Sequence, residues 1–211
     1  MRSYNVPFVE NPDDMCVPAS IGMVLGYFMT EKNFTMDDLI KLTGYRKGFG
    51  SWPTESMANL ANLGFKTRWI EDFDHAEFIK NPKHYLSTIL DEESLNWQVE
   101  HSDLELEASR IKAYLDSGHV IEHRKGTKED ITELLDGGWL VRLEVNASTL
   151  ADKAGYDGHS VLVVGYDKAG VTLHNPDGTN GNKPNQKVSW EKLKQAWKEF
   201  GGSYSIYAFR R

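Results

Sequence analysis

Cysteine is nearly absent from this sequence: among 211 residues, only Cys16 is a cysteine. A single cysteine excludes an internal disulfide and any zinc site that needs several thiolates. It favours the reducing cytoplasm, and a secreted location stays open if a signal peptide has been removed, because a free thiol functions in both places. The length is sufficient for one domain with a substantial packed core.

The sequence also lacks long apolar runs and a surplus of positive charge. No segment is apolar over the length that a bilayer requires, so we expect no membrane span. The formal net charge is −7 and no long basic run is present, which argues against a nucleic-acid partner. Residues 178–186 (GTNGNKPNQ) lack the Gly-Lys-Ser/Thr of a phosphate loop, so we expect a mobile loop and no nucleotide site.

What the sequence does contain is a helical first half and a strand-rich second half. Apolar residues at helical spacing predict helices over 17–29, 35–44, 52–64, 103–118, 128–138 and 189–200. Runs of β-branched and aromatic residues predict strands over 65–70, 139–146, 158–167, 170–175 and 203–210. Residues 72–103 carry scattered helix signals without clear boundaries. We predict one α+β domain over 1–211, with a helical lobe over about 1–100 and a mostly antiparallel sheet lobe over about 101–211.

The only thiol lies at the predicted start of a helix. Cys16 precedes an apolar helical stripe, and Pro18 falls in the first turn, where its missing N–H costs nothing. Unpaired N–H groups and the dipole at a helix N-terminus favour the thiolate, which is the nucleophilic form. The negative charges of Asp13 and Asp14 oppose this effect.

A base and an orienting group are predicted to lie together elsewhere in the chain. His159 starts the apolar strand GHSVLVVGYD, and Asn175 ends the next strand, VTLHNP. If GYDKAG turns a hairpin between them, the two residues become neighbours within a residue or two of register. Cysteine, histidine and asparagine are the residues that a thiol acyl-transfer enzyme needs as nucleophile, base and orienting group.

Five segments in order resemble one known family. They are VPFVENPDDMCVPASIGMVLGYF, LLDGGWLVRLEVN, GHSVLVVGYD, VTLHNPDG and VSWEKLKQAW. Together they resemble the papain-clan peptidase domain that trims double-glycine leaders from bacteriocins, and its free-standing C39-like relatives. The resemblance implies a papain-like cysteine proteinase fold, with the catalytic cysteine at Cys16 and the histidine at His159. It places the family's aspartate at Asn175, an asparagine as in papain-like enzymes more generally.

Two positions leave alternatives open. The resemblance places an oxyanion-binding glutamine six residues before the cysteine, where this chain has Glu10. An ionised carboxylate repels a developing negative charge, so either Glu10 is protonated, Asn11 serves instead, or the chemistry is weak or different. For the orienting group, Asp177 and His174 are the nearby substitutes for Asn175.

One motif suggests a different chemistry. HVIEH at 119–123 matches the H-x-x-E-H zinc signature of inverted zincins, which requires a continuous helix. Gly118 and Gly126 enclose the stretch, and its β-branched residues favour a strand. We therefore expect two surface histidines on a short strand rather than a metal site.

These observations predict a cysteine peptidase that acts on a peptide or protein substrate without metal or organic cofactor. The alternatives are a thiol acyltransferase, such as a transpeptidase or deamidase, and a catalytically weak pseudoenzyme that binds peptides. Glu10 is the feature that favours the pseudoenzyme. The sequence does not define an oligomeric state.

Overall fold

One sheet organises the chain and draws strands from both halves of the sequence. The computed structural model describes residues 1–211. Its strands are β1 (Arg2–Ser3), β2 (Lys66–Glu71), β3 (Ile121–His123), β4 (Leu140–Asn146), β5 (Gly158–Tyr166), β6 (Gly170–Asn175), β7 (Lys183–Ser189) and β8 (Ile206–Arg210). They form an 8-stranded sheet in the order β3-β2-β8-β4-β5-β6-β7, with β1 paired to β5. Only the β2–β3 pair is parallel.

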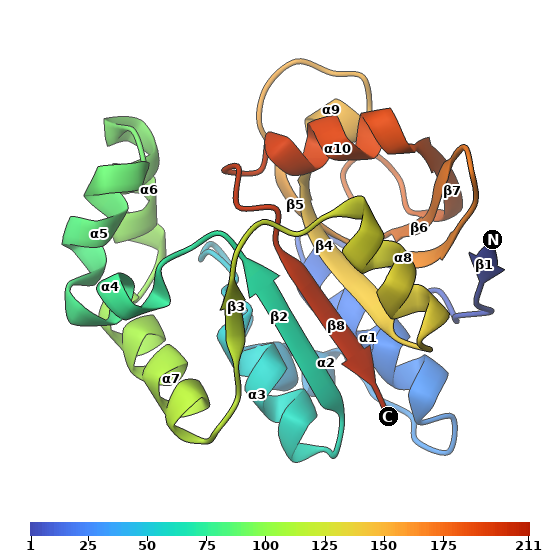
Figure 1. Ribbon diagram of the computed structural model, residues 1–211, viewed down its shortest axis with the longest axis horizontal. Helices are drawn as coiled ribbons and strands as arrows, with labels where there is room; N and C mark the ends of the chain where they lie inside the picture. The colour runs from blue at the N-terminus through green and yellow to red at the C-terminus, as the bar shows by residue number, and fades with distance from the viewer.

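Helices cover both faces of this sheet (Figure 1). They are α1 (Cys16–Phe28), α2 (Met36–Thr43), α3 (Thr54–Asn62), α4 (His75–Lys80), α5 (Pro82–Ile89), α6 (Glu92–His101), α7 (Leu104–Asp116), α8 (Lys128–Asp136), α9 (Ala147–Leu150) and α10 (Trp190–Lys198). Alternate residues of each strand point to opposite faces, and each face carries its own apolar core. Leu162 and Val164 of β5 join the core that contains α1, whereas Val161 and Val163 join the core beneath α8 and α10. The central strands are therefore apolar on both faces.

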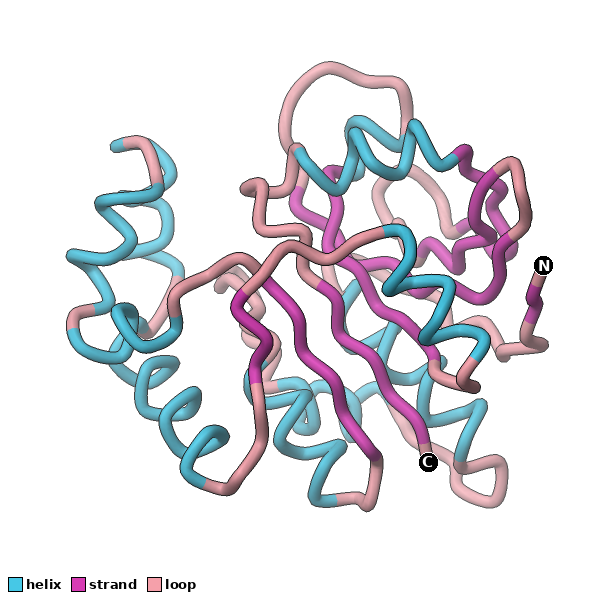
Figure 2. The backbone as a smooth tube through the Cα atoms, in the orientation of Figure 1, coloured by secondary structure: helices cyan, strands magenta, loops and turns pink.

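The predicted α+β class is confirmed, but the boundary near residue 100 does not separate helices from sheet. β2 comes from the first hundred residues and pairs with β8 near the C-terminus. α7 comes from the second half and packs against α4. Figure 2 shows α4 to α7 as a helical arm beside β3. The arm is inserted between β2 and β3. The chain leaves the sheet after β2 and returns to it at β3, which pairs with β2.

The arm does have clear helix boundaries, contrary to the prediction for 72–103. The side chains of Asp74, Asn81 and Asp91 each accept a backbone N–H at the start of α4, α5 and α6. Pro82 follows Asn81 in the first turn of α5, where a proline is tolerated. These polar residues are N-caps, which are hard to distinguish from loop residues when the helices they begin are short.

The predicted mobile loop over 178–186 is wrong in its second part. Residues 183–186 belong to β7, which pairs antiparallel with β6. Leu173 lies opposite Gln186, and the register shifts before Asn175, which lies opposite Lys183. Backbone pairing to a buried neighbouring strand thus overrides the turn-forming composition of this segment.

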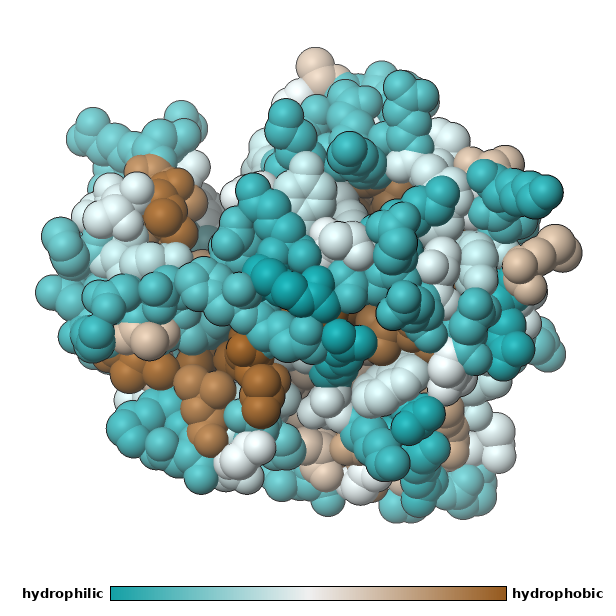
Figure 3. Space-filling model, in the orientation of Figure 1, coloured by the Kyte–Doolittle hydropathy of each residue, from teal (hydrophilic) through white to brown (hydrophobic).

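The surface is mostly hydrophilic in Figure 3, with an apolar patch at the lower left, over the region of α7 and β3. Val120 is 71% exposed at this edge of the sheet. None of the helices combines the length and the apolar character needed to cross a membrane.

The close approach of β6 and β7 at Gly170 yields the first testable prediction. A Cβ on Gly170 meets the carbonyl oxygen of Val188 and comes within 2.8 Å of the Cα of Ser189. Because both are backbone atoms of the neighbouring strand, we expect Gly170→Ala to lower the free energy of unfolding by about 3 kcal/mol, measured by urea denaturation. At Gly118 nothing lies within 4 Å and only the positive φ of 84° opposes a Cβ. We expect Gly118→Ala to cost only about 1 kcal/mol; equal losses for the two variants would contradict this account.

Candidate active site

Cys16 is the first residue of α1, and the helix start is left open. Met15 occupies the N-cap position without a side-chain hydrogen bond to the helix, so the first backbone N–H groups have no partner within it. The approach to the helix is fixed instead by Asn11, whose Oδ1 accepts the N–H of Asp13 (3.1 Å) and of Met15 (2.9 Å). The partly buried thiol of Cys16 therefore belongs to the first residue of an uncapped helix.

His159 and Asn175 meet at the start of β5 and the end of β6. The register pairs Leu162 with His174, so Asn175 lies two residues diagonally from His159 across the two strands. The Nε2 atom of His159 donates to Oδ1 of Asn175 at 2.7 Å, and both side chains are buried. An amide oxygen only accepts, so Nε2 carries the proton and Nδ1 is left unprotonated in the neutral ring.

The thiol of Cys16 lies beside His159, and each group shifts the pKa of the other. Burial alone raises the pKa of the Cys16 thiol, but the hydrogen bond and the charge of His159, together with the backbone N–H of Ser160, bring it below its usual value. Burial lowers the pKa of His159, and its contacts with Cys16 and Asn175 outweigh this effect and raise it. The arrangement thus favours a thiolate beside an imidazolium.

The orientation of Asn175 depends on a residue that sequence analysis did not identify. Nδ2 of Asn175 donates to Oε1 of Gln186 on β7 at 2.8 Å. This bond turns the amide so that its oxygen faces His159. The turn-forming composition of residues 178–186 predicts a loop, so Gln186 is not identified as a strand residue. The only sequence feature that indicates a strand here is the apolar Val188 two residues later, which lies on the buried side of β7.

The two candidates for the oxyanion-binding position differ sharply in their surroundings. Glu10 is exposed. Asn11 is buried, and its Nδ2 donates to the carbonyl oxygen of Pro176 at 2.9 Å. Asn182 also bonds to both backbone groups of Asn11. Asn11 therefore connects the loop before α1 to the loop after β6, and its amide N–H points at that loop.

The two substitutes for Asn175 have other partners. His174 is buried, and its Nε2 lies 2.9 Å from the carbonyl oxygen of Val6 while its Nδ1 accepts the N–H of Asn185. A ring nitrogen that accepts an N–H is unprotonated, so the ring of His174 is neutral, and burial lowers its pKa in agreement. Asp177 is also buried and accepts from Asn180, and its charge contributes to the raised pKa of His159 without a hydrogen bond between them.

The H-x-x-E-H stretch does not form a helix. His119 follows α7 and stacks on Tyr114 with 4.4 Å between ring centroids. Glu122 and His123 lie in strand β3, where Glu122 pairs with Arg68 and Arg124. An extended backbone points neighbouring side chains to opposite sides, so the zinc-binding geometry of a helix is not formed.

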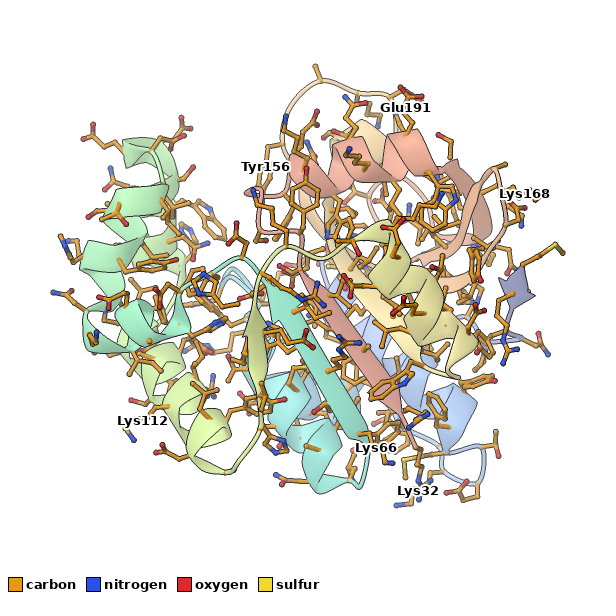
Figure 4. All side chains as sticks on the ribbon, in the orientation of Figure 1. Lys32, Lys66, Lys112, Tyr156, Lys168 and Glu191 are labelled. Carbon is orange, nitrogen blue, oxygen red and sulfur yellow. The ribbon has the colours of Figure 1, made fainter.

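An exposed aromatic residue lies near His159. Tyr156 is 65% exposed in the loop before β5, and its ring centroid lies 6.2 Å from that of Phe200. In Figure 4 it lies below α10, on the side that faces the α4–α6 part of the arm. A Cβ added at Gly158, the residue directly before His159, would lie 3.1 Å from the ring of Phe200 and 3.1 Å from the hydroxyl of Tyr156.

Comparison with solved structures agrees with this architecture. A putative C39-like peptidase from Bacillus anthracis is 16% identical over 100% of this chain and 98% of its own, with a TM-score of 0.55. The peptidase domain of the Streptococcus transporter ComA is 14% identical over 97% and 98%, with a TM-score of 0.50. A double-glycine motif protease in complex with its leader peptide is 13% identical over 99% and 92%, also at 0.50.

These likenesses confirm the papain-like fold that the five sequence segments predict. No curated protein matches the chain. A family model described as "Peptidase_C39 like family" matches residues 3–205, which is nearly the whole chain. The chain therefore belongs to the C39-like peptidase family.

Proposed function

We propose that this protein is a cysteine peptidase in which Cys16 is the nucleophile, His159 the acid and base, and Asn175 the orienting group. The proposal is carried by the 2.7 Å hydrogen bond from His159 to Oδ1 of Asn175, together with the thiol of Cys16 beside the same imidazole. Membership of the C39-like family supports it.

The reaction begins with attack of the Cys16 thiolate on the carbonyl carbon of a peptide bond. His159 has taken the thiol proton on Nδ1, because Nε2 already donates to Asn175. It returns that proton to the leaving amine, and a thioester forms. The neutral imidazole then takes a proton from water, which attacks the thioester and releases the acid and the free thiol.

The negative oxygen of the tetrahedral intermediate is held at the start of α1. The first N–H groups of this helix are uncapped, and the N–H of Cys16 is the one nearest the forming bond. In this family a glutamine side chain adds a second donor, and here Glu10 occupies that position. Asn11 stays the alternative donor: Pro176 takes one of the two N–H donors of its side-chain amide.

The substrate is a peptide or a protein segment in extended form. One similar structure is a double-glycine motif protease bound to a leader peptide, which supports a peptide ligand for this fold. Tyr156 is exposed next to the strand that carries His159, and it offers an aromatic surface to such a chain.

Alkylation of the single cysteine tests the nucleophile directly. We expect Cys16 to react with iodoacetamide at neutral pH at least about tenfold faster than an unperturbed thiol, because the lowered thiol pKa provides more thiolate. His159→Ala removes this advantage and abolishes peptide hydrolysis, whereas His123→Ala, at an exposed histidine on β3, leaves both unchanged. Equal alkylation rates in the wild type and His159→Ala would exclude a poised thiol.

A reaction with an added amine separates hydrolysis from acyl transfer, because an acyltransferase forms the amide of the added amine and a hydrolase forms the free acid.

The pH profile tests the roles of Asn175 and Asp177. The active ion pair exists above the lowered pKa of Cys16 and below the raised pKa of His159, so kcat/KM follows a bell. Asn175→Ala removes a hydrogen bond that raises the pKa of His159, so the falling limb moves to lower pH and the maximum decreases. Asp177→Asn moves the same limb by a smaller amount and keeps most of the activity, because it contributes charge alone. A larger effect of Asp177→Asn would reverse the two roles.

Substitution of Glu10 distinguishes a slow enzyme from a pseudoenzyme. We expect Glu10→Gln to raise kcat by about 10²-fold, because it supplies an oxyanion donor and removes a negative charge. Glu10→Ala removes the charge alone and is expected to give a smaller gain. Peptide binding without hydrolysis in all three proteins would instead identify a binding module.

A further inference from the structure

A buried row of polar side chains continues from the Cys16–His159 pair toward the arm. Reading across the sheet, it contains Ser160 on β5, Arg142 and Glu144 on β4, Tyr207 on β8 and Glu71 on β2, and all of them are buried. Each member contacts the next, and Glu71 ends the row at His75 of α4 with a distance of 3.0 Å. The sheet is largely apolar elsewhere on this face, so the row needs a physical explanation.

Arg142 is the unusual member, because its side chain is 0% exposed. Its guanidinium lies 4.2 Å from the ring centroid of Tyr207 and 3.3 Å from Oε1 of Glu144. Its Nε has no partner. Removing a charge from water costs several kcal/mol unless the partners are excellent, and one long contact with a carboxyl is weak compensation.

Two carboxyls share the hydroxyl of Tyr207 beside this cation. The hydroxyl of Tyr207 lies 2.9 Å from Oε2 of Glu71 and 3.1 Å from Oε2 of Glu144. Tyr207 has a single proton, which it shares between these two acceptor oxygens. Burial raises the pKa of Glu144, whereas bonds from His75 and other donors bring the pKa of Glu71 below its usual value despite burial. Glu144, the carboxyl in contact with Arg142, is thus the weaker acid of the two.

The guanidinium is connected to the nucleophile through two serines. Nη1 of Arg142 donates to Oγ of Ser160 (3.3 Å), and that hydroxyl donates to Oγ of Ser20 (3.2 Å), one helical turn after Cys16. The backbone N–H of Ser160 lies near enough to the Cys16 sulfur to lower the pKa of the thiol. The charged group of Arg142 thus contacts Ser160, which lies next to the Cys16 sulfur.

We propose that Arg142 is a positioning residue of the proposed peptidase: its buried charge stabilises the Cys16 thiolate from the sheet side and holds Ser160 against the sulfur. The other charged or titratable groups around the pair are Asp177 after β6, and Asp13 and Asp14 with Tyr45 beside the start of α1. All three carboxylates disfavour a thiolate. Arg142 opposes them, and it supplies positive charge to a site where Glu10 takes the place of an oxyanion donor.

The inference rests on the proposed function, and the pH dependence of Cys16 alkylation tests the two separately. We expect Arg142→Met, which keeps the volume and removes the charge, to move the midpoint upward by about one pH unit, or about tenfold less thiolate below it. Arg142→Lys keeps the charge and restores most of the shift. Circular dichroism and thermal melting confirm that each variant is folded.

A double variant shows whether the shift in Arg142→Met comes from the lost charge or from a folding defect. Arg142→Met combined with Glu144→Gln removes the cation together with its carboxyl partner, so no carboxylate is left buried without its cation. We expect the same raised midpoint as in Arg142→Met. A wild-type midpoint in either of these two variants overturns the role of Arg142, while a wild-type protein that titrates near the ordinary thiol value of about 8.5 overturns the proposed function itself.

Discussion

The structure depends on the contact between the first turn of α1 and the first residues of β5. Packing of α1 on the apolar face of β5 brings residues more than a hundred positions apart into one site. The bonds between Ser20 and Ser160 fix this contact within one turn of Cys16. Because the helix and the strand are both buried, the thiol and the imidazole are positioned by the core rather than by flexible loops.

Around this contact, each additional residue of the site comes from a neighbouring strand. β6 carries Asn175, β7 carries Gln186, and β4 carries Arg142 on the opposite side. Neighbouring strands lie about 4.8 Å apart, so side chains at corresponding heights reach one another in sequence across the sheet. The strand spacing of the sheet thus sets the positions of the polar side chains from the edge at β7 to the arm at His75.

The sequence was sufficient to predict the class of fold and the residues that meet at the centre. Strong periodicity identified the helix after Cys16 and the strand after His159, and a hairpin brought Asn175 within reach. Gln186 and the arm helices were not predicted, because pairing across strands and short capped helices depend on tertiary partners. Arg142 and Glu144 lie in a strand where charge alternates with apolar residues, a pattern that also describes a solvent-exposed face.

The position of Gln186 has a consequence for the local stability of the site. β7 is the last strand of the sheet, and only β6 holds it. When β7 alone separates from β6, the Asn175 amide becomes free to rotate, while Cys16 and His159 stay in the folded core of the molecule. Amide protons near Gln186 should therefore exchange with solvent long before those of α1 and β5, and the ring of His159 loses its fixed orientation each time the strand separates.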